Sequence, residues 1–128
     1  MEQIGNQKGI GLIEVLVSMI LLAFGVLGLA MMVLTSIQGN SASRENTIAA
    51  NLIKQQIELY ESMDTLPAAP YELQESGLRD MFARSTYMMD HASDSTVPEG
   101  ACRIQVAVSW TDQQEVERNR SFSTYLLK

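Results

Sequence analysis

Positive charge is scarce in this sequence, and the cations that are present do not cluster. The 9 Lys and Arg residues stand against 15 Asp and Glu residues, which gives a formal net charge of -6. In the C-terminal half, single arginines are scattered among acids, at Arg79, Arg84, Arg103, Arg118 and Arg120. Because binding a phosphate backbone requires clustered cations, this distribution argues against direct nucleic-acid binding.

Cysteine and histidine are scarcer still. Cys102 is the single cysteine, so no intrachain disulfide can form, and the alternatives are a buried free thiol or a disulfide to another chain. His91 lies in an acidic stretch with Asp90, Asp94 and Glu99, but these residues lack the ligand spacing and the glycine of an EF-hand loop. No Ser, Cys or His has a recognisable nucleophile setting. We therefore expect no enzyme activity, no metal and no cofactor.

Long apolar runs are confined to the N-terminus. The run from Ile10 to Leu34 would span about 37 Å as a helix, more than the roughly 30 Å hydrocarbon core of a bilayer. A cleaved signal peptide is the alternative, although its apolar region is usually about 7–15 residues long. Lys8 precedes the run, which favours a cytoplasmic N-terminus.

Proline is absent from the segment that follows, residues 35–64, whose single glycine is Gly39. The helix is therefore expected to continue to Met63, over about 80 Å, with a kink at Gly39 or in the adjoining "GNSAS". Five apolar residues recur at spacings of three and four, at Ala49, Leu52, Ile53, Ile57 and Tyr60. Charged residues are expected on the other faces, at Arg44, Glu45, Lys54, Glu58 and Glu61.

The C-terminal part shows the alternation that is typical of strands. In "ACRIQVAVSWTD", one face carries Cys102, Ile104, Val106, Val108 and Trp110. A second strand is expected in "EVERNRSFSTYLL", with Phe122, Thr124 and Leu126 on one face and "DQQE" as the turn. The middle segment is less regular, with a short helical turn expected around Leu78, Met81 and Phe82 and a loop in "DHASDSTVPEG".

Glu14 is an ionisable residue inside the apolar run. A carboxylate costs on the order of 2.5–3.5 kcal/mol at the bilayer centre, so it must be protonated, lie at the interface or have a partner. No Lys or Arg lies between Lys8 and Arg44. A cut between Gly9 and Ile10 would create an amine, and a neighbouring helix shifted along its axis could pair its carboxylate with that amine. At about 4 Å such a pair is worth about 4 kcal/mol at an effective dielectric constant near 20.

The residues around Glu14 carry a resemblance. Lys8 and Gly9 followed by "IGLIEVLVSMILL" resemble the N-terminus of type IV prepilins. The resemblance implies that residues 1–9 are a leader, that a prepilin peptidase cuts after Gly9 and methylates the amine of Ile10, and that Glu14 is the fifth mature residue. The family usually has phenylalanine where this chain has Ile10.

Within that superfamily, "LIEVLVSMILLAFGVLGLA" and "RENTIAANL" look most like the type IV pilus modification protein, the PilV-type minor pilins. The implied fold is α+β and pilin-like, a long N-terminal helix with a membrane half and an amphipathic half packed on a small C-terminal antiparallel sheet. Residues 10–37 would form the transmembrane or filament-core helix and residues 38–128 the periplasmic domain. Many pilins also have a C-terminal cysteine pair, which the single Cys102 cannot supply.

The resemblance further implies an inner-membrane single-pass protein that later enters the pilus and supports its assembly and surface display. Its partners would be the prepilin peptidase, other minor pilins and the major pilin. Two alternatives stay open: a minor pseudopilin of a type II secretion system, and an unprocessed, membrane-anchored periplasmic binding domain.

Overall fold

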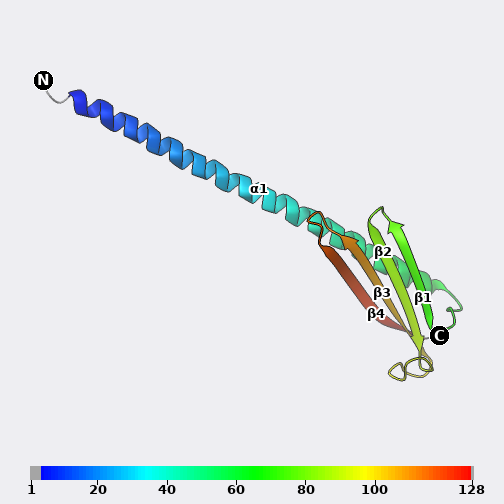
Figure 1. The fold of residues 1–128 in the computed structure, drawn as a ribbon. Helices are drawn as coiled ribbons and strands as arrows, with labels where there is room; N and C mark the ends of the chain where they lie inside the picture. Colours follow the sequence, from blue (N-terminus) through cyan, green and yellow to red (C-terminus); the bar gives the residue numbers. More distant parts are fainter. Residues whose placement is uncertain (1–3, 128) are drawn as a thin grey trace. The chain divides into compact units, whose positions relative to one another are not determined.

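The computed structural model describes residues 4–127, with side chains from Gly11 onward (Figure 1). One helix is followed by four strands: α1 (Ile4–Ser62), β1 (Tyr71–Leu78), β2 (Phe82–Asp90), β3 (Ala101–Thr111) and β4 (Glu117–Leu127). The chain divides into two compact units, Met1–Ser41 and Ala42–Lys128. The first unit is helical where it is described, and the second contains the end of α1 together with the whole sheet. This confirms the predicted α+β class.

Helix α1 covers 59 residues and begins before the expected start at Ile10. The helix continues through Gly39 without interruption, as expected for a segment that contains no proline. It ends at Ser62, one residue before the predicted end, and the chain then runs through Pro67 and Pro70, which cannot continue a helix.

The four strands form one antiparallel sheet in the order β1-β2-β3-β4, so each strand pairs with its neighbour in sequence. The outermost strands are β1 and β4, and each leaves one edge of its backbone without a neighbouring strand in the described chain (Figure 1). The β3–β4 register places Phe122 opposite Val106 and Leu126 opposite Cys102, which confirms the predicted shared face.

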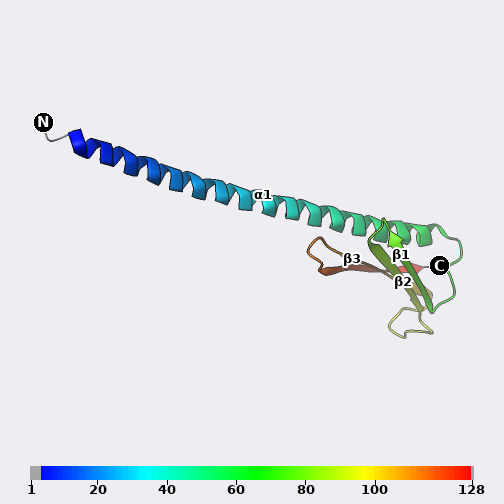
Figure 2. The same cartoon turned by 45° about the horizontal axis from the view of Figure 1, so that its top comes forward.

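The core of the second unit lies between one face of the sheet and the end of α1, which lies along that face in both views (Figure 2). The helix contributes Ala49, Leu52, Ile53 and Tyr60, as its apolar periodicity predicted, with Ile57 partly buried beside them. The sheet contributes the alternating side chains of β2 and β3 and one residue of β4: Phe82, Met88, Ile104, Val106, Val108, Trp110 and Leu126. Trp110 is thus the core anchor that the alternation predicted.

The middle segment differs from the prediction. A short helical turn was expected around Leu78, Met81 and Phe82, but Leu78 ends β1 and Phe82 begins β2, so these residues form a hairpin. Gly77, Arg79 and Asp80 all have positive φ at this turn, a conformation that no helix uses. The predicted loop after Asp90 is confirmed, since β3 begins only at Ala101.

Candidate assembly site

The apolar half of α1 has no protein cover in the described structure. Every residue from Gly11 to Asn40 is exposed, and large apolar side chains such as Leu22, Phe24 and Met32 are 69%, 69% and 73% exposed. In water this much apolar surface would be costly, since each such side chain forgoes about 1.5–3 kcal/mol of burial. Among the described residues, this helix is the one long and apolar enough to cross a membrane.

Glu14 lies on this exposed stretch, where the structure places it on one helix surface with Val15, Ser18, Met19 and Leu22. A carboxylate therefore stands in an apolar stripe whose other polar member is a serine one turn away. Gly9 and Ile10 belong to the helical backbone, and their side chains lie outside the described residues.

The second unit holds a buried carboxylate that the sequence pattern assigned to the wrong face. Glu45 is 8% exposed, and its Oε2 accepts a hydrogen bond of 3.1 Å from the indole Nε1 of Trp110. Glu45 precedes Ala49 by four residues and Leu52 by seven, so it belongs to the same helix face. Its charge suggested solvent, but the indole N–H provides a partner that makes burial tolerable.

A buried arginine, one of those that are scattered among acids in the sequence, connects the sheet to the helix. The side chain of Arg84 lies on the face of the sheet that packs against α1. Its Nε and Nη2 lie 2.7 and 2.6 Å from Oε2 of Glu75 on β1. Its Nη1 also donates to the main-chain oxygen of Leu52 in α1, at 3.1 Å. The alternation of buried residues in β2 includes this position, so the period of two was the signal that could have revealed it.

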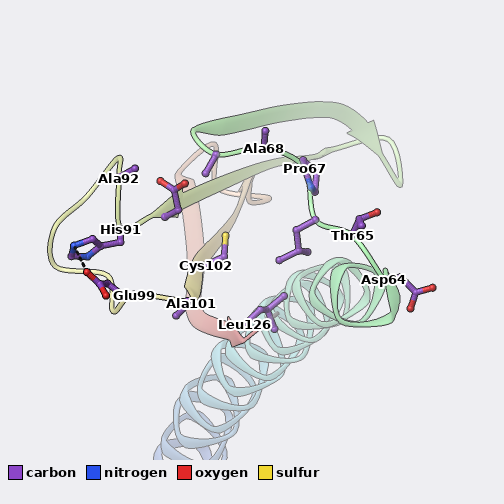
Figure 3. Close-up of a pocket in the computed structure, with 14 residues that line it drawn as sticks. Asp64, Thr65, Pro67, Ala68, His91, Ala92, Glu99, Ala101, Cys102 and Leu126 are labelled. Carbon is purple, nitrogen blue, oxygen red and sulfur yellow. Dashed lines mark ion pairs between the residues drawn. The ribbon is translucent and has the colours of Figure 1, made fainter.

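A pocket of about 730 Å³ lies at the end of the sheet. It is lined by the linker that follows α1, the β2–β3 loop and the first residues of β3 (Figure 3). Cys102 lies in its wall and is half-buried rather than fully buried as expected. Burial and the nearby charge of Asp90 raise the pKa of the thiol, so it is protonated near neutral pH and a poor nucleophile.

His91 lies at the rim of this pocket on the exposed loop. Its Nδ1 is 2.7 Å from the carbonyl oxygen of Val97, and its Nε2 is 3.9 Å from Oε1 of Glu99 (Figure 3). Asp94 accepts a hydrogen bond from the hydroxyl of Thr96 and forms an ion pair with Arg103, whose Nη2 lies 2.6 Å from Oδ2. Among the residues whose side chains are described, no three His, Cys, Asp or Glu form a metal-binding group.

Comparison with known families identifies one segment of the chain. Residues 4–30 match the family model described as the prokaryotic N-terminal methylation motif. No curated protein and no solved structure gives a significant match to the chain. The matched segment is the one that contains Gly9, Ile10 and Glu14, and it supports the predicted prepilin-like superfamily.

The motif and the exposed apolar helix together define a class. They support a type IV pilin-like or pseudopilin protein that is anchored to the membrane by a single span. The motif also implies processing by a prepilin peptidase. Proteins of this class are structural subunits rather than enzymes.

Proposed function

We propose that the chain is a minor type IV pilin of the pilus modification group, which enters or primes the pilus and supports its assembly and surface display. The single observation that carries the proposal is the methylation motif, which is continuous with an uncovered apolar helix that leads into a small α+β unit. The narrower group rests on the resemblance of "GVLGLA" and "RENTIAANL" to those minor pilins.

The proposed maturation begins with cleavage between Gly9 and Ile10. Residues 1–9 leave as the leader, and the new α-amine of Ile10 is methylated. Residues 10–37 then hold the protein in the inner membrane, with the N-terminus cytoplasmic and residues 38–128 in the periplasm. The lysine that precedes the apolar run supports this orientation.

The proposed role of Glu14 is to set the axial position of the helix among its neighbours. Its carboxylate would pair with the α-amine of an adjacent pilin whose helix is shifted along the axis. This pairing would remove the cost of an isolated charge in an apolar environment while the neighbouring helices cover the side chains exposed in the monomer. The partners of this step are the other minor pilins and the major pilin.

The arginines of the folded unit bear on whether nucleic acid is among its partners. Three of the four arginines in the strands are paired with acids, in the Arg84–Glu75, Arg103–Asp94 and Arg118–Asp112 pairs, which leaves Arg120 as an isolated cation among the described residues. Since phosphate binding needs free, clustered cations, direct binding to nucleic acid is not part of the proposed function.

Deletion of the chromosomal copy separates the pilus from a secretion machine. We expect fewer surface pili and reduced twitching motility, adhesion or DNA uptake, with normal secretion of exoproteins. Complementation by the wild-type chain should restore the pili. Loss of exoprotein secretion with normal piliation would instead assign the chain to a type II secretion system. Normal pili and normal secretion would leave an anchored binding domain.

A further inference from the structure

Strand β4 is an edge strand whose core-facing side is incompletely covered. The register places Phe122 opposite Val106 and Arg120 opposite Val108, so both point to the face that α1 covers. Val106 and Val108 are fully buried, yet Phe122 is 54% exposed. Phe122 faces the same side of the sheet as the core but is exposed to solvent, which indicates that the core is not fully covered beside β4.

A groove of about 430 Å³ lies beside Phe122, between β4 and α1. Its apolar floor includes Ile53 and Ile57 of the helix, and Arg120 lines it from the strand. The helix also contributes charged residues to the lining, at Lys54, Glu58 and Glu61. Arg120 makes no ion pair with any other residue in the described part of the chain. The groove therefore offers an apolar floor, a free cation and an unpaired strand edge side by side.

Strand β1 lies at the opposite edge of the same sheet (Figure 1). Its side chains have the complementary pattern. Leu73 lies opposite Thr86 and Glu75 opposite Arg84, so an apolar and an acidic side chain both point to the helix-covered face. Leu73 is half-buried, and the side chain of Glu75 is 32% exposed although it contacts Arg84. The neighbouring Gln74 is exposed on the outer face.

We propose that β4 binds the β1 strand of a second copy of this chain, in antiparallel register, with Leu73 of the second copy opposite Phe122 and its Glu75 opposite Arg120. The added strand brings Leu73 over the apolar floor of the groove and an acid to its free cation. Aromatic–aliphatic and opposite-charge pairs across strands each stabilise such a contact. The unpaired backbone groups of both edges gain hydrogen bonds.

The direction of the strands favours this head-to-tail contact over a symmetric one. In a meander of four antiparallel strands, a translated copy presents β1 antiparallel to β4, and the helical segments 42–62 of both copies stay parallel. Both chains then leave their sheets in the same direction, as chains anchored in one membrane must. A two-fold pairing of β4 with β4 would send them in opposite directions and would place like charges near each other. A head-to-tail contact can also repeat from copy to copy.

Disulfide trapping in membranes tests the contact on the full-length chain. In the proposed register Gln74 of one copy lies opposite Ser121 of the next, and both are exposed on the outer face. In a Cys102→Ser background, the Gln74→Cys/Ser121→Cys variant should form oxidised dimers and higher multimers. The two positions lie on opposite edges of one sheet, three strands apart at about 4.8 Å each, so a bond within one chain cannot form.

Matched variants test the proposed register and the proposed charge pair. Gln74→Cys with Ser123→Cys, shifted by two residues, should give little product, and neither Gln74→Cys nor Ser121→Cys should crosslink alone. Adding Arg120→Glu to the productive pair should lower crosslinking about fivefold, because opposite charges become like charges. Arg44→Glu, at a cation of α1 that is also exposed, should leave crosslinking unchanged.

Three results would overturn the proposal: equal crosslinking of the shifted pair, dimers formed by Ser121→Cys alone, or crosslinks exclusively to a different protein. The measurement uses membranes from a strain without other pilins and does not depend on leader cleavage. Its outcome is therefore separate from the outcome of the deletion experiment.

Discussion

A chain carrying Glu14→Gln is expected to reach the membrane and to be processed, but to be lost from sheared pili. Glutamine has the size of glutamate without its charge, so the cost of placing an ion in the apolar run disappears and insertion is at least as favourable. The substitution also removes the proposed attraction to a neighbour's amine, which would be worth about 4 kcal/mol at about 4 Å in a medium of effective dielectric constant near 20. Incorporation measured by immunoblot of sheared pili should fall by about two to three orders of magnitude.

Two variants serve as controls for this result. Ser18→Ala changes the other polar residue on the same surface of the helix and should leave incorporation unchanged. Glu14→Asp keeps the charge on a shorter side chain and should retain part of the incorporation. If the glutamine variant entered pili at the wild-type level, Glu14 would have no role in assembly, and protonation or an interfacial location would explain its presence.

Arg84→Met is expected to lower the free energy of unfolding of the second unit by about 3 kcal/mol, a large share of the stability of a small domain. The substitution fills similar volume but removes both bonds to Glu75 and the bond to the carbonyl of Leu52. It also leaves the carboxylate of Glu75 without its cation at a site that is only 32% exposed. Guanidinium unfolding of the full chain in detergent micelles can be followed through Trp110, the single tryptophan.

The double variant Glu75→Gln/Arg84→Met separates lost packing from the unpaired charge. It should recover much of the stability, because it removes the uncompensated carboxylate. Arg120→Met, at an exposed cation, should change stability by less than about 0.5 kcal/mol. An Arg84→Met chain as stable as the wild type would show that the contact between sheet and helix contributes nothing measurable.

The sequence was most informative where apolar residues repeat with one clear period. The spacing from Ala49 to Tyr60 predicted the buried face of α1, and the alternation from Cys102 to Trp110 predicted the buried face of β3. Lys8-Gly9 and Glu14 led to a proposed assembly site because a charge in an apolar run is costly and short motifs are local in sequence; the match to the methylation motif over residues 4–30 supports the class of protein.

The errors arose where a polar side chain is buried with a partner distant in sequence. Glu45 was assigned to a solvated face, but the indole of Trp110, 65 residues away, accounts for its burial. The burial of Arg84 was not predicted, because its partners, Glu75 and the carbonyl of Leu52, meet only in the folded unit. The first hairpin was missed since its strands carry many polar residues, and the positive φ angles of Arg79 and Asp80 leave little trace in residue type.

The most direct test of the central claim is the N-terminal sequence and mass of the chain purified from membranes of its own host, with the prepilin peptidase present or deleted. We predict peptidase-dependent loss of residues 1–9 and a methylated Ile10 as the first residue. A chain that keeps its first nine residues in both strains would contradict the prepilin account. The motif would then mark an ordinary membrane anchor, and Glu14 would need another explanation.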